Sequence, residues 1–168
     1  MTRQTNEVSH RLLRRTDWRF LLDNPHIDVT LCLAEGLLRQ SVEHVSHSMA
    51  DRDSGAREDC NLVVATDPTA QMLNNAWSRL RPGGSCYTEW TVRGDSTEPK
   101  SLLEAAGFEQ VAVYGVEGPA WMVGDFDRQW ADPALRRDIL HVAAALEREP
   151  SVIGASAHLL AVGRKAAL

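Results

Sequence analysis

The sequence predicts an α/β fold, because apolar segments with the spacing of strands alternate along the chain with segments that have the spacing of helices. The clearest stretch is Cys60–Val92. Within it, the Val-rich run Asn61–Ala65 predicts a strand, and apolar residues at i, i+1, i+4, i+5 and i+8 predict a helix over 72–80. Ser85–Val92 then predicts a second strand, so this stretch forms a strand–helix–strand unit.

Turn and cap residues mark the ends of these elements. Asp67 is expected to cap the helix, since its carboxylate can accept a free backbone N–H at the first turn. Pro68 suits the first helical position, where no N–H is needed. Pro82-Gly83-Gly84 is expected to end the helix before the second strand begins.

The rest of the chain continues the same alternation. Runs rich in β-branched and other apolar residues predict further strands, and segments with caps and helical spacing predict further helices. Strands are expected at Ile27–Ala34, Gln110–Gly115 and Ala157–Val162, and helices at Leu37–Met49, 101–107 and 133–148. Gly107 is expected to end the second of these helices as a left-handed cap, and Asp132 to cap the start of the third.

Two short motifs add a resemblance to a known family. Leu80-Arg81-Pro82-Gly83-Gly84 ends one helix, and Ala106-Gly107-Phe108 ends the next, after the intervening strand. This succession resembles the second half of a class I S-adenosylmethionine-dependent methyltransferase, over about Asn61–Val116, a third of the chain. The resemblance implies a Rossmann-like sheet whose strands follow the family's order first, fourth, fifth, seventh, sixth. It also implies that Ala157–Val162 is antiparallel to its neighbours.

The cofactor loop departs from the family's pattern. In class I methyltransferases the first strand is followed by an acidic residue and G-x-G, whose glycines let the backbone approach the cofactor. The matching segment, Ala34-Glu35-Gly36-Leu37-Leu38, has one glycine, and a leucine side chain fills the space that a second glycine would leave empty. We therefore expect no bound cofactor. If S-adenosylmethionine still binds, the resemblance implies Glu35, Gly36 and Asp67 as its contacts.

The segment between Gly36 and Asn61 is expected to hold one helix and a polar loop, with no room for the family's second and third strands. The expected sheet is therefore truncated, with about five strands. The acidic residue that binds the cofactor ribose in the family then has no candidate. Asp51 and Asp53 are present, but we expect them to be solvated charges of the loop.

Truncation would leave the strand Ile27–Ala34 at an edge of the sheet, with unpaired N–H and C=O groups. The N-terminal arm, residues 1–25, could cover this edge through Trp18 and Phe20. A second chain could also dock there, by strand addition or through a hydrophobic face.

Two polar residues are weak candidates for catalysis. Glu89 lies near the end of a predicted strand, where the resemblance places substrate contacts, although it could equally be a surface carboxylate. His141 follows Asp138 by three residues on a predicted helix, so the two could form an acid–base pair. A helical histidine beside an apolar stripe is more often satisfied locally.

Three tryptophans are candidates for binding a substrate or a partner protein: Trp90, Trp121 and Trp130. Trp121 and Trp130 lie in the loop Glu117–Asp132, beyond a predicted strand, and open α/β sheets bind ligands beyond the carboxyl ends of their strands. The alternative is that these side chains cap the core or an oligomer interface, because exposed aromatic surface is costly.

Length and composition restrict the class of protein. The 168 residues, 43% of them hydrophobic, are expected to fold as one domain, residues 1–168. A net charge of -5 argues against general binding to nucleic acid or anionic membranes. No apolar run approaches the roughly 20 residues of a membrane span, and the N-terminus lacks a signal-peptide core, so we expect a cytoplasmic protein. Cys32, Cys60 and Cys86 show no metal-ligand spacing.

Two classes of function follow from these observations. The first is a methyltransferase-like protein that has lost its cofactor and acts as a partner-dependent auxiliary subunit, either as a homodimer or with another protein. The resemblance places it in a bacterial biosynthetic pathway that tailors natural products. The alternative is an enzyme: a small active S-adenosylmethionine-dependent methyltransferase, or a tailoring enzyme that reuses the same cleft.

Overall fold

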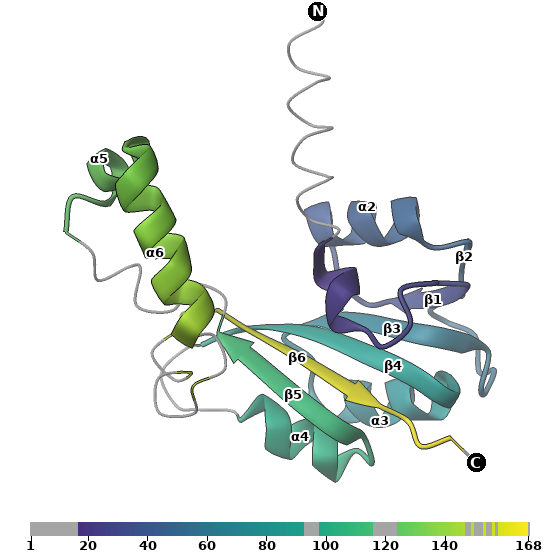
Figure 1. Ribbon diagram of the computed structural model, residues 1–168. Coiled ribbons are helices and arrows are strands. Elements are labelled where there is room, and N and C mark those ends of the chain that lie inside the picture. Colours follow the sequence, from purple (N-terminus) through teal and green to yellow (C-terminus); the bar gives the residue numbers. More distant parts are fainter. Residues whose placement is uncertain are drawn as a thin grey trace, which may run out of the picture.

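The computed structural model describes residues 17–92, 98–115, 124–146, 149, 153, 156 and 158–167. These residues form a six-stranded sheet with helices on both faces (Figure 1). The strands are β1 (Val29–Cys32), β2 (Ser48–Met49), β3 (Cys60–Thr66), β4 (Leu80–Thr91), β5 (Glu109–Gly115) and β6 (His158–Arg164). The helices are the 3₁₀ helix η1 (Asp17–Leu21) and the α-helices α2 (Gly36–Val45), α3 (Ala70–Arg79), α4 (Pro99–Ala105), α5 (Phe126–Ala131) and α6 (Pro133–Leu146).

The strand order is β2-β1-β3-β4-β6-β5. The first four strands of this order are parallel neighbours, while β6 lies antiparallel between β4 and β5. Apart from β2, this is the expected order of first, fourth, fifth, seventh and sixth strands. The prediction of a truncated, Rossmann-like α/β sheet with an antiparallel last strand is therefore confirmed.

Strand β2 corrects two expectations. Helix α2 ends at Val45 rather than at Met49, and β2 pairs in parallel with Val29 and Thr30 of β1. As a result β1 is not an edge strand, and the sheet has six strands where about five were expected. A strand of two residues has no side-chain periodicity to recognise, so only its backbone pairing with β1 defines it.

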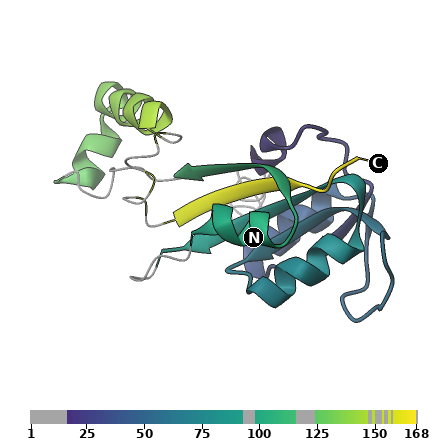
Figure 2. The same ribbon diagram turned by 90° about the horizontal axis from the view of Figure 1, so that it is seen from below.

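Residues 17–25, the described part of the N-terminal arm, pack on a face of the sheet, whereas the edge of β1 that the arm was expected to cover is paired with β2. Figures 1 and 2 show η1 and α2 on one face and α3 and α4 on the other. Trp18 is buried, and its ring centroid lies 5.1 Å from that of Tyr87. The Trp18 indole N–H donates to the Ser41 hydroxyl at 3.3 Å, so the polar group of this buried side chain has a hydrogen-bond partner. The expectation that Phe20 also anchors the arm is wrong, because this side chain is 76% exposed.

The opposite face is covered by α3 and α4. Gly107 ends the second of these helices with φ at +97°, which confirms the expected left-handed cap. Its carbonyl accepts the indole N–H of Trp77 at 3.0 Å. A Cβ on Gly107 would lie 3.1 Å from that same indole nitrogen, so both the backbone angle and the packing favour glycine.

The segment Pro82-Gly83-Gly84 lies inside β4, which corrects its assignment as the end of a helix. Helix α3 already ends at Arg79, and the chain passes directly into β4. A Cβ on Gly84 would lie 2.9 Å from the backbone oxygen of Arg81 and 3.1 Å from that of Asn61. The glycine is therefore needed where β4 bulges against β3.

A buried arginine organises the loop between β2 and β3. The Arg79 side chain is 7% exposed and binds both carboxylate oxygens of Asp59, at 2.8 and 2.6 Å. Its remaining N–H groups donate to the carbonyls of Ser54 at 3.0 Å and Asp51 at 2.9 Å. One side chain from α3 thus holds three points of a loop that has no regular structure of its own.

Helices α5 and α6 form a hairpin that stands apart from the sheet, at the end where β5 finishes (Figures 1 and 2). Asp132 caps α6 as expected, since its carboxylate accepts the N–H groups of Ala134 at 2.8 Å and Leu135 at 3.3 Å. Neither helix has a buried residue.

Candidate functional site

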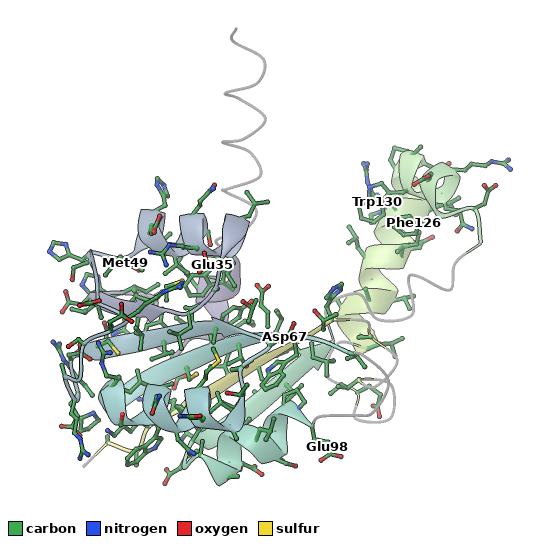
Figure 3. The ribbon with its side chains drawn as sticks, turned by 180° about the vertical axis from the view of Figure 1, so that it is seen from behind. Glu35, Met49, Asp67, Glu98, Phe126 and Trp130 are labelled. Atoms are coloured by element: carbon green, nitrogen blue, oxygen red, sulfur yellow. The ribbon has the colours of Figure 1, made fainter. Side chains whose placement is uncertain are left out.

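Three of the predicted site residues lie at the same edge of the sheet. Since β1, β3 and β4 are parallel, their carboxyl ends lie at the same edge, which we call the carboxyl edge. Glu35 comes after β1, Asp67 follows β3, and Glu89 lies near the end of β4; Glu35 and Asp67 are labelled in Figure 3. Open α/β sheets bind their ligands beyond this edge, so it is the candidate site.

The guanidinium group of Arg52 occupies the end of β1. Its Nε–H donates to the carbonyl of Cys32 at 2.6 Å, and one terminal N–H donates to the carbonyl of Ala34 at 2.8 Å. The other terminal nitrogen forms an ion pair with the Glu35 carboxylate at 2.7 Å. These bonds engage the carbonyl of the last residue of β1 and a carbonyl just after it, together with the acidic residue that was expected to contact a cofactor.

Sequence reasoning missed Arg52. It lies in the segment Asp51–Cys60, whose composition indicates only a solvated loop. Strand β2 brings Arg52 beside β1, because the loop begins immediately after this short strand. No spacing in the sequence signals that contact.

Glu35 and Gly36 form the turn into α2. Hydrogen bonding to Arg52, and then the charge of that guanidinium, hold the pKa of Glu35 below its usual value. Gly36 has φ at +62°, which favours glycine. A Cβ on Gly36 would meet no atom of the described residues within 4 Å. The glycine therefore serves the turn itself and no close approach of another group.

Asp51 lies two residues beyond β2 and is exposed, in the loop where the sequence placed it. Its carboxylate accepts the backbone N–H of Asp53 at 3.1 Å, within the loop. Its backbone carbonyl is held by Arg79. The Asp51 carboxylate thus lies shortly after β2, the strand next to β1, and its hydrogen bond to Asp53 keeps it within the loop.

Asp67 joins the ends of β3 and β4. Its carboxylate accepts the backbone N–H of Thr91 at 2.7 Å, and its own N–H donates to the carbonyl of Glu89 at 2.8 Å. The expectation that Asp67 caps the helix is wrong, because Thr69 is the cap and accepts the N–H of Met72 at 3.2 Å. Asp67 also has φ at +42°, a strained value for a residue with a side chain.

Glu89 and Trp90 end β4 in different surroundings. Glu89 is half-buried, and its carboxylate accepts the Tyr87 hydroxyl at 3.0 Å. Trp90 packs in the core at 7% exposure, and its indole N–H donates to Thr88 at 2.7 Å. Little of the Trp90 side chain is therefore left for the substrate or partner that was predicted to bind it.

The other candidates lie on the hairpin or outside the described residues. Trp130 is 37% exposed and stacks on Phe126, with ring centroids 5.4 Å apart. Figure 3 shows both rings on the part of the hairpin that is remote from the sheet. His141 and Asp138 are exposed on α6, so the structure does not bring His141 to the carboxyl edge. Trp121 lies outside the described residues.

The titratable groups of the core are not arranged for metal or thiol chemistry. Among the described residues, no group of three or more His, Cys, Asp or Glu could hold a metal ion. Burial raises the pKa of Cys32 and of Cys86, and raises that of Cys60 to about 11. These thiols are therefore protonated at neutral pH.

Within the part of the chain that the structure describes, no helix is long and apolar enough to cross a membrane.

A pocket of about 150 Å³ lies at the opposite edge, beside the amino ends of β3 and β4. It is lined by Leu22, Asn24, Ile27, Asn61, Leu62, Arg81, Pro82, Gly83, Gly84 and Ser85. The length of the sheet separates this pocket from the carboxyl edge, so it is not part of the candidate site.

The strand order, the antiparallel β6 and the helices on both faces are those of the class I methyltransferase fold in a truncated form. The chain is therefore methyltransferase-like in its fold. No family model and no curated protein sequence matches the chain.

Two solved structures illustrate the likeness. One is an S-adenosylmethionine-dependent methyltransferase from Archaeoglobus fulgidus, with a TM-score of 0.54 and 11% identity over 92% of this chain and 94% of that one. The other is phosphoethanolamine N-methyltransferase 2 of Haemonchus contortus, solved with S-adenosyl-L-methionine, with a TM-score of 0.51 and 10% identity. The match covers 94% of this chain and 52% of the Haemonchus enzyme, so the chain spans about half the length of that enzyme. At such identities the likeness shows the fold alone.

Proposed function

We propose that this chain is a methyltransferase-like protein that does not bind S-adenosylmethionine and acts as an auxiliary subunit of a protein partner. The observation that carries the proposal is the guanidinium group of Arg52, which lies at the end of β1. This is the part of the fold where the resemblance places the cofactor loop.

The residues at this end of β1 do not fit the cofactor. Arg52 donates three hydrogen bonds here, two to backbone carbonyls and one to Glu35, the residue expected to contact a cofactor, so a cofactor that used Glu35 would compete with Arg52 for it. Bonds from a charged donor are roughly twice as strong as neutral ones, so their loss opposes binding. Gly36 is the single glycine of the turn, and Leu38 is buried behind it. We therefore assign no methyl-transfer step to this edge.

The hairpin supports the second half of the proposal, dependence on a partner. Its apolar side chains, Trp130 and Phe126 among them, are exposed in a pair of helices without a buried residue. Exposed apolar patches of this kind mark interaction sites. A bacterial pathway that tailors natural products belongs to the proposal on the strength of the resemblance only. A cytoplasmic location belongs to it because the sequence shows neither a membrane-span-like apolar run nor a signal-peptide core.

The alternative is a small active methyltransferase, or a tailoring enzyme that reuses the carboxyl edge. It is supported by the names of the structural neighbours, which are S-adenosylmethionine-dependent methyltransferases. Glu89 would then be the polar group at the edge, since it lies near the end of β4 and is half-buried beside Tyr87.

Titration calorimetry with S-adenosylmethionine and S-adenosylhomocysteine tests the proposal. The wild-type chain is expected to release no heat of binding, and micromolar affinity would contradict the proposal in favour of the alternative. Arg52→Ala tests the cause, because a gain of affinity would identify this guanidinium as the obstacle. Arg81→Ala is the matched control: it removes an arginine near the opposite edge, with a side chain 48% exposed compared with 35% for Arg52.

Partner dependence is tested separately, by coexpressing the chain with the products of its genomic neighbours and purifying it through a tag. A stoichiometric complex that survives gel filtration is the expected result. A chain that stays alone with every neighbour would contradict the role as a subunit, whatever the calorimetry shows about the cofactor.

A further inference from the structure

The pocket at the amino ends of β3 and β4, which we call the amino-edge pocket, is built by three segments that lie far apart in the sequence. One wall comes from the chain between η1 and β1, and another from the amino end of β3. The third wall is formed by residues 81–85 of β4. A ligand in this pocket would therefore contact all three segments at once.

An irregularity in β4 shapes the third wall. Between the aligned pairs Cys60–Leu80 and Leu62–Ser85, β3 advances by two residues while β4 advances by five. The extra residues of β4 leave the regular ladder and form a bulge, and bulges re-aim side chains and are frequent beside binding sites. The bulge thus places Arg81 in the wall of the pocket, outside the regular pairing with β3.

The amino-edge pocket has an apolar floor and a polar mouth. Leu22, Ile27 and Leu62 line it and are buried, whereas Asn24 and Arg81 line it and are exposed. Its volume of about 150 Å³ is below the roughly 300 Å³ at which pockets for drug-sized ligands begin. The pocket therefore suits a molecule of a few carbon atoms.

Two amide side chains at the pocket have donors to spare. The Oδ1 atom of Asn24 accepts the backbone N–H of His26 at 2.9 Å, and that of Asn61 accepts the N–H of Val29 at 2.7 Å. Because a backbone N–H can only donate, these bonds fix which end of each amide is the oxygen. Among the described residues, neither NH₂ group has a hydrogen-bond partner. Both amides can therefore donate to a ligand.

Arg81 adds a positive charge to these donors. Its Nε–H donates to the carbonyl of Glu58 at 3.2 Å, and one terminal nitrogen donates to that of Asp59 at 3.4 Å. The other terminal nitrogen lies 3.8 Å from the Asp28 carboxylate, beyond hydrogen-bond distance. The side chains of Arg81 and Asp28 are 48% and 49% exposed, so Asp28 can turn to water when a ligand carboxylate arrives.

We infer that the amino-edge pocket binds a small aliphatic carboxylate. The carboxylate accepts hydrogen bonds from the amides of Asn24 and Asn61 and pairs with Arg81, while the short chain lies on the apolar floor. A neutral ligand would leave the charge of Arg81 unmatched, and an inorganic anion would leave the floor uncovered. The pocket is separate from the carboxyl edge, so this inference does not depend on whether the chain binds S-adenosylmethionine.

Titration of the isotope-labelled full chain with sodium butyrate, followed by NMR, tests the site. Butyrate is expected to bind with a Kd of about 1 mM and to shift the side-chain NH₂ signals of Asn24 and Asn61 in a saturable way. Butyramide, which has the same shape without the charge, should bind about 10-fold more weakly, and so should acetate, which lacks most of the chain. Absence of a saturable shift at about ten times this Kd would overturn the inference. Equal binding of butyramide or of acetate would also overturn it, because the pocket would then not select an aliphatic carboxylate.

The variant Asn61→Asp separates binding from folding. Its carboxylate can still accept the N–H of Val29, so the contact between β1 and β3 is kept, but it removes the donors and repels the ligand. The affinity for butyrate should fall about 10-fold or more, and Arg81→Gln, at an exposed position, should have a similar effect. The matched control is Asn74→Asp, which makes the same change of charge at an exposed position of α3 and should bind butyrate like the wild type.

Two outcomes of the variant series would overturn the assignment. Unchanged affinity in Asn61→Asp and Arg81→Gln would place butyrate outside this pocket. An equal loss of affinity in Asn74→Asp would show that butyrate responds only to the net charge of the chain.

Discussion

The ion pair between Arg79 and Asp59 is expected to respond unequally to loss of its two partners. The Arg79 side chain is 7% exposed and the Asp59 side chain is 27% exposed. Asp59→Ala leaves a buried guanidinium without its carboxylate, whereas Arg79→Leu leaves a carboxylate that water can reach. We therefore expect Asp59→Ala to be the more damaging change.

The structure sets the size of both effects. Removing one partner of a buried pair costs about 3–5 kcal/mol, because the other charge stays buried and unpaired. In Asp59→Ala the guanidinium keeps its bonds to the carbonyls of Ser54 and Asp51, so we expect the lower end, about 3 kcal/mol. Arg79→Leu should cost about 1–2 kcal/mol, since leucine fills much of the same buried space and water can reach the carbonyls of Ser54 and Asp51 in their largely exposed loop.

Urea unfolding at neutral pH, followed by tryptophan fluorescence, measures both free energies of unfolding. A change of 3 kcal/mol corresponds to a lower Tm by about 6–12 °C for a chain of this length. The double variant completes a mutant cycle, which isolates the coupling between the two side chains. Equal losses, or a larger loss for Arg79→Leu, would refute the reasoning from burial.

The same pair predicts a pH dependence. Hydrogen bonding to Arg79 holds the pKa of Asp59 below its usual value in the folded chain. A carboxyl with a lowered folded pKa adds stability at pH values above its unfolded pKa, about 3.9, and loses it as pH falls through the folded pKa. The stability difference between wild type and Asp59→Ala should stay constant near neutrality and shrink below about pH 4.

Two further predictions concern the core. No thiol should react with Ellman's reagent in the native chain at neutral pH, because Cys32, Cys60 and Cys86 are buried and their pKa values are raised. All three thiols should react in denaturant. A fast reaction of the native chain would contradict their burial. Gly84→Ala should destabilise by about 2 kcal/mol or more, because its Cβ would lie 2.9 Å from a backbone oxygen, whereas Gly36→Ala should cost about 1 kcal/mol through its positive φ alone. Urea unfolding that showed the reverse order would contradict the packing at Gly84.

Much of the fold could be predicted from the sequence, because it depends on local patterns. Runs of apolar residues predicted the five longer strands. Their order in the sheet was implied by the family resemblance that two short motifs carry, and not by the local patterns. The caps at Asp132 and Gly107 were also predicted, since each depends on residues within one turn of its helix. Exact ends were less predictable: α2 stops at Val45 because a two-residue strand follows it.

The candidate site could be predicted in part. Placing Glu35, Asp67 and Glu89 near strand ends was enough to expect them at one edge, since parallel strands share their carboxyl edge. Their partners were not predictable. The loop sequence around Arg52 looks like any solvated loop, and Trp90 has the same local sequence whether it faces a ligand or the core.

The sequence by itself therefore determined the fold class and the residues at the carboxyl edge, and the resemblance that its motifs carry implied the order of the main strands. Only the tertiary structure decided that Arg52 reaches the carbonyls at the end of β1, and that Asp67 joins two strands instead of capping a helix. The physical reason is the range of the interactions. Helical and strand periods act over a few residues, whereas these contacts join groups about 20 residues apart, and only the packing of the chain selects them.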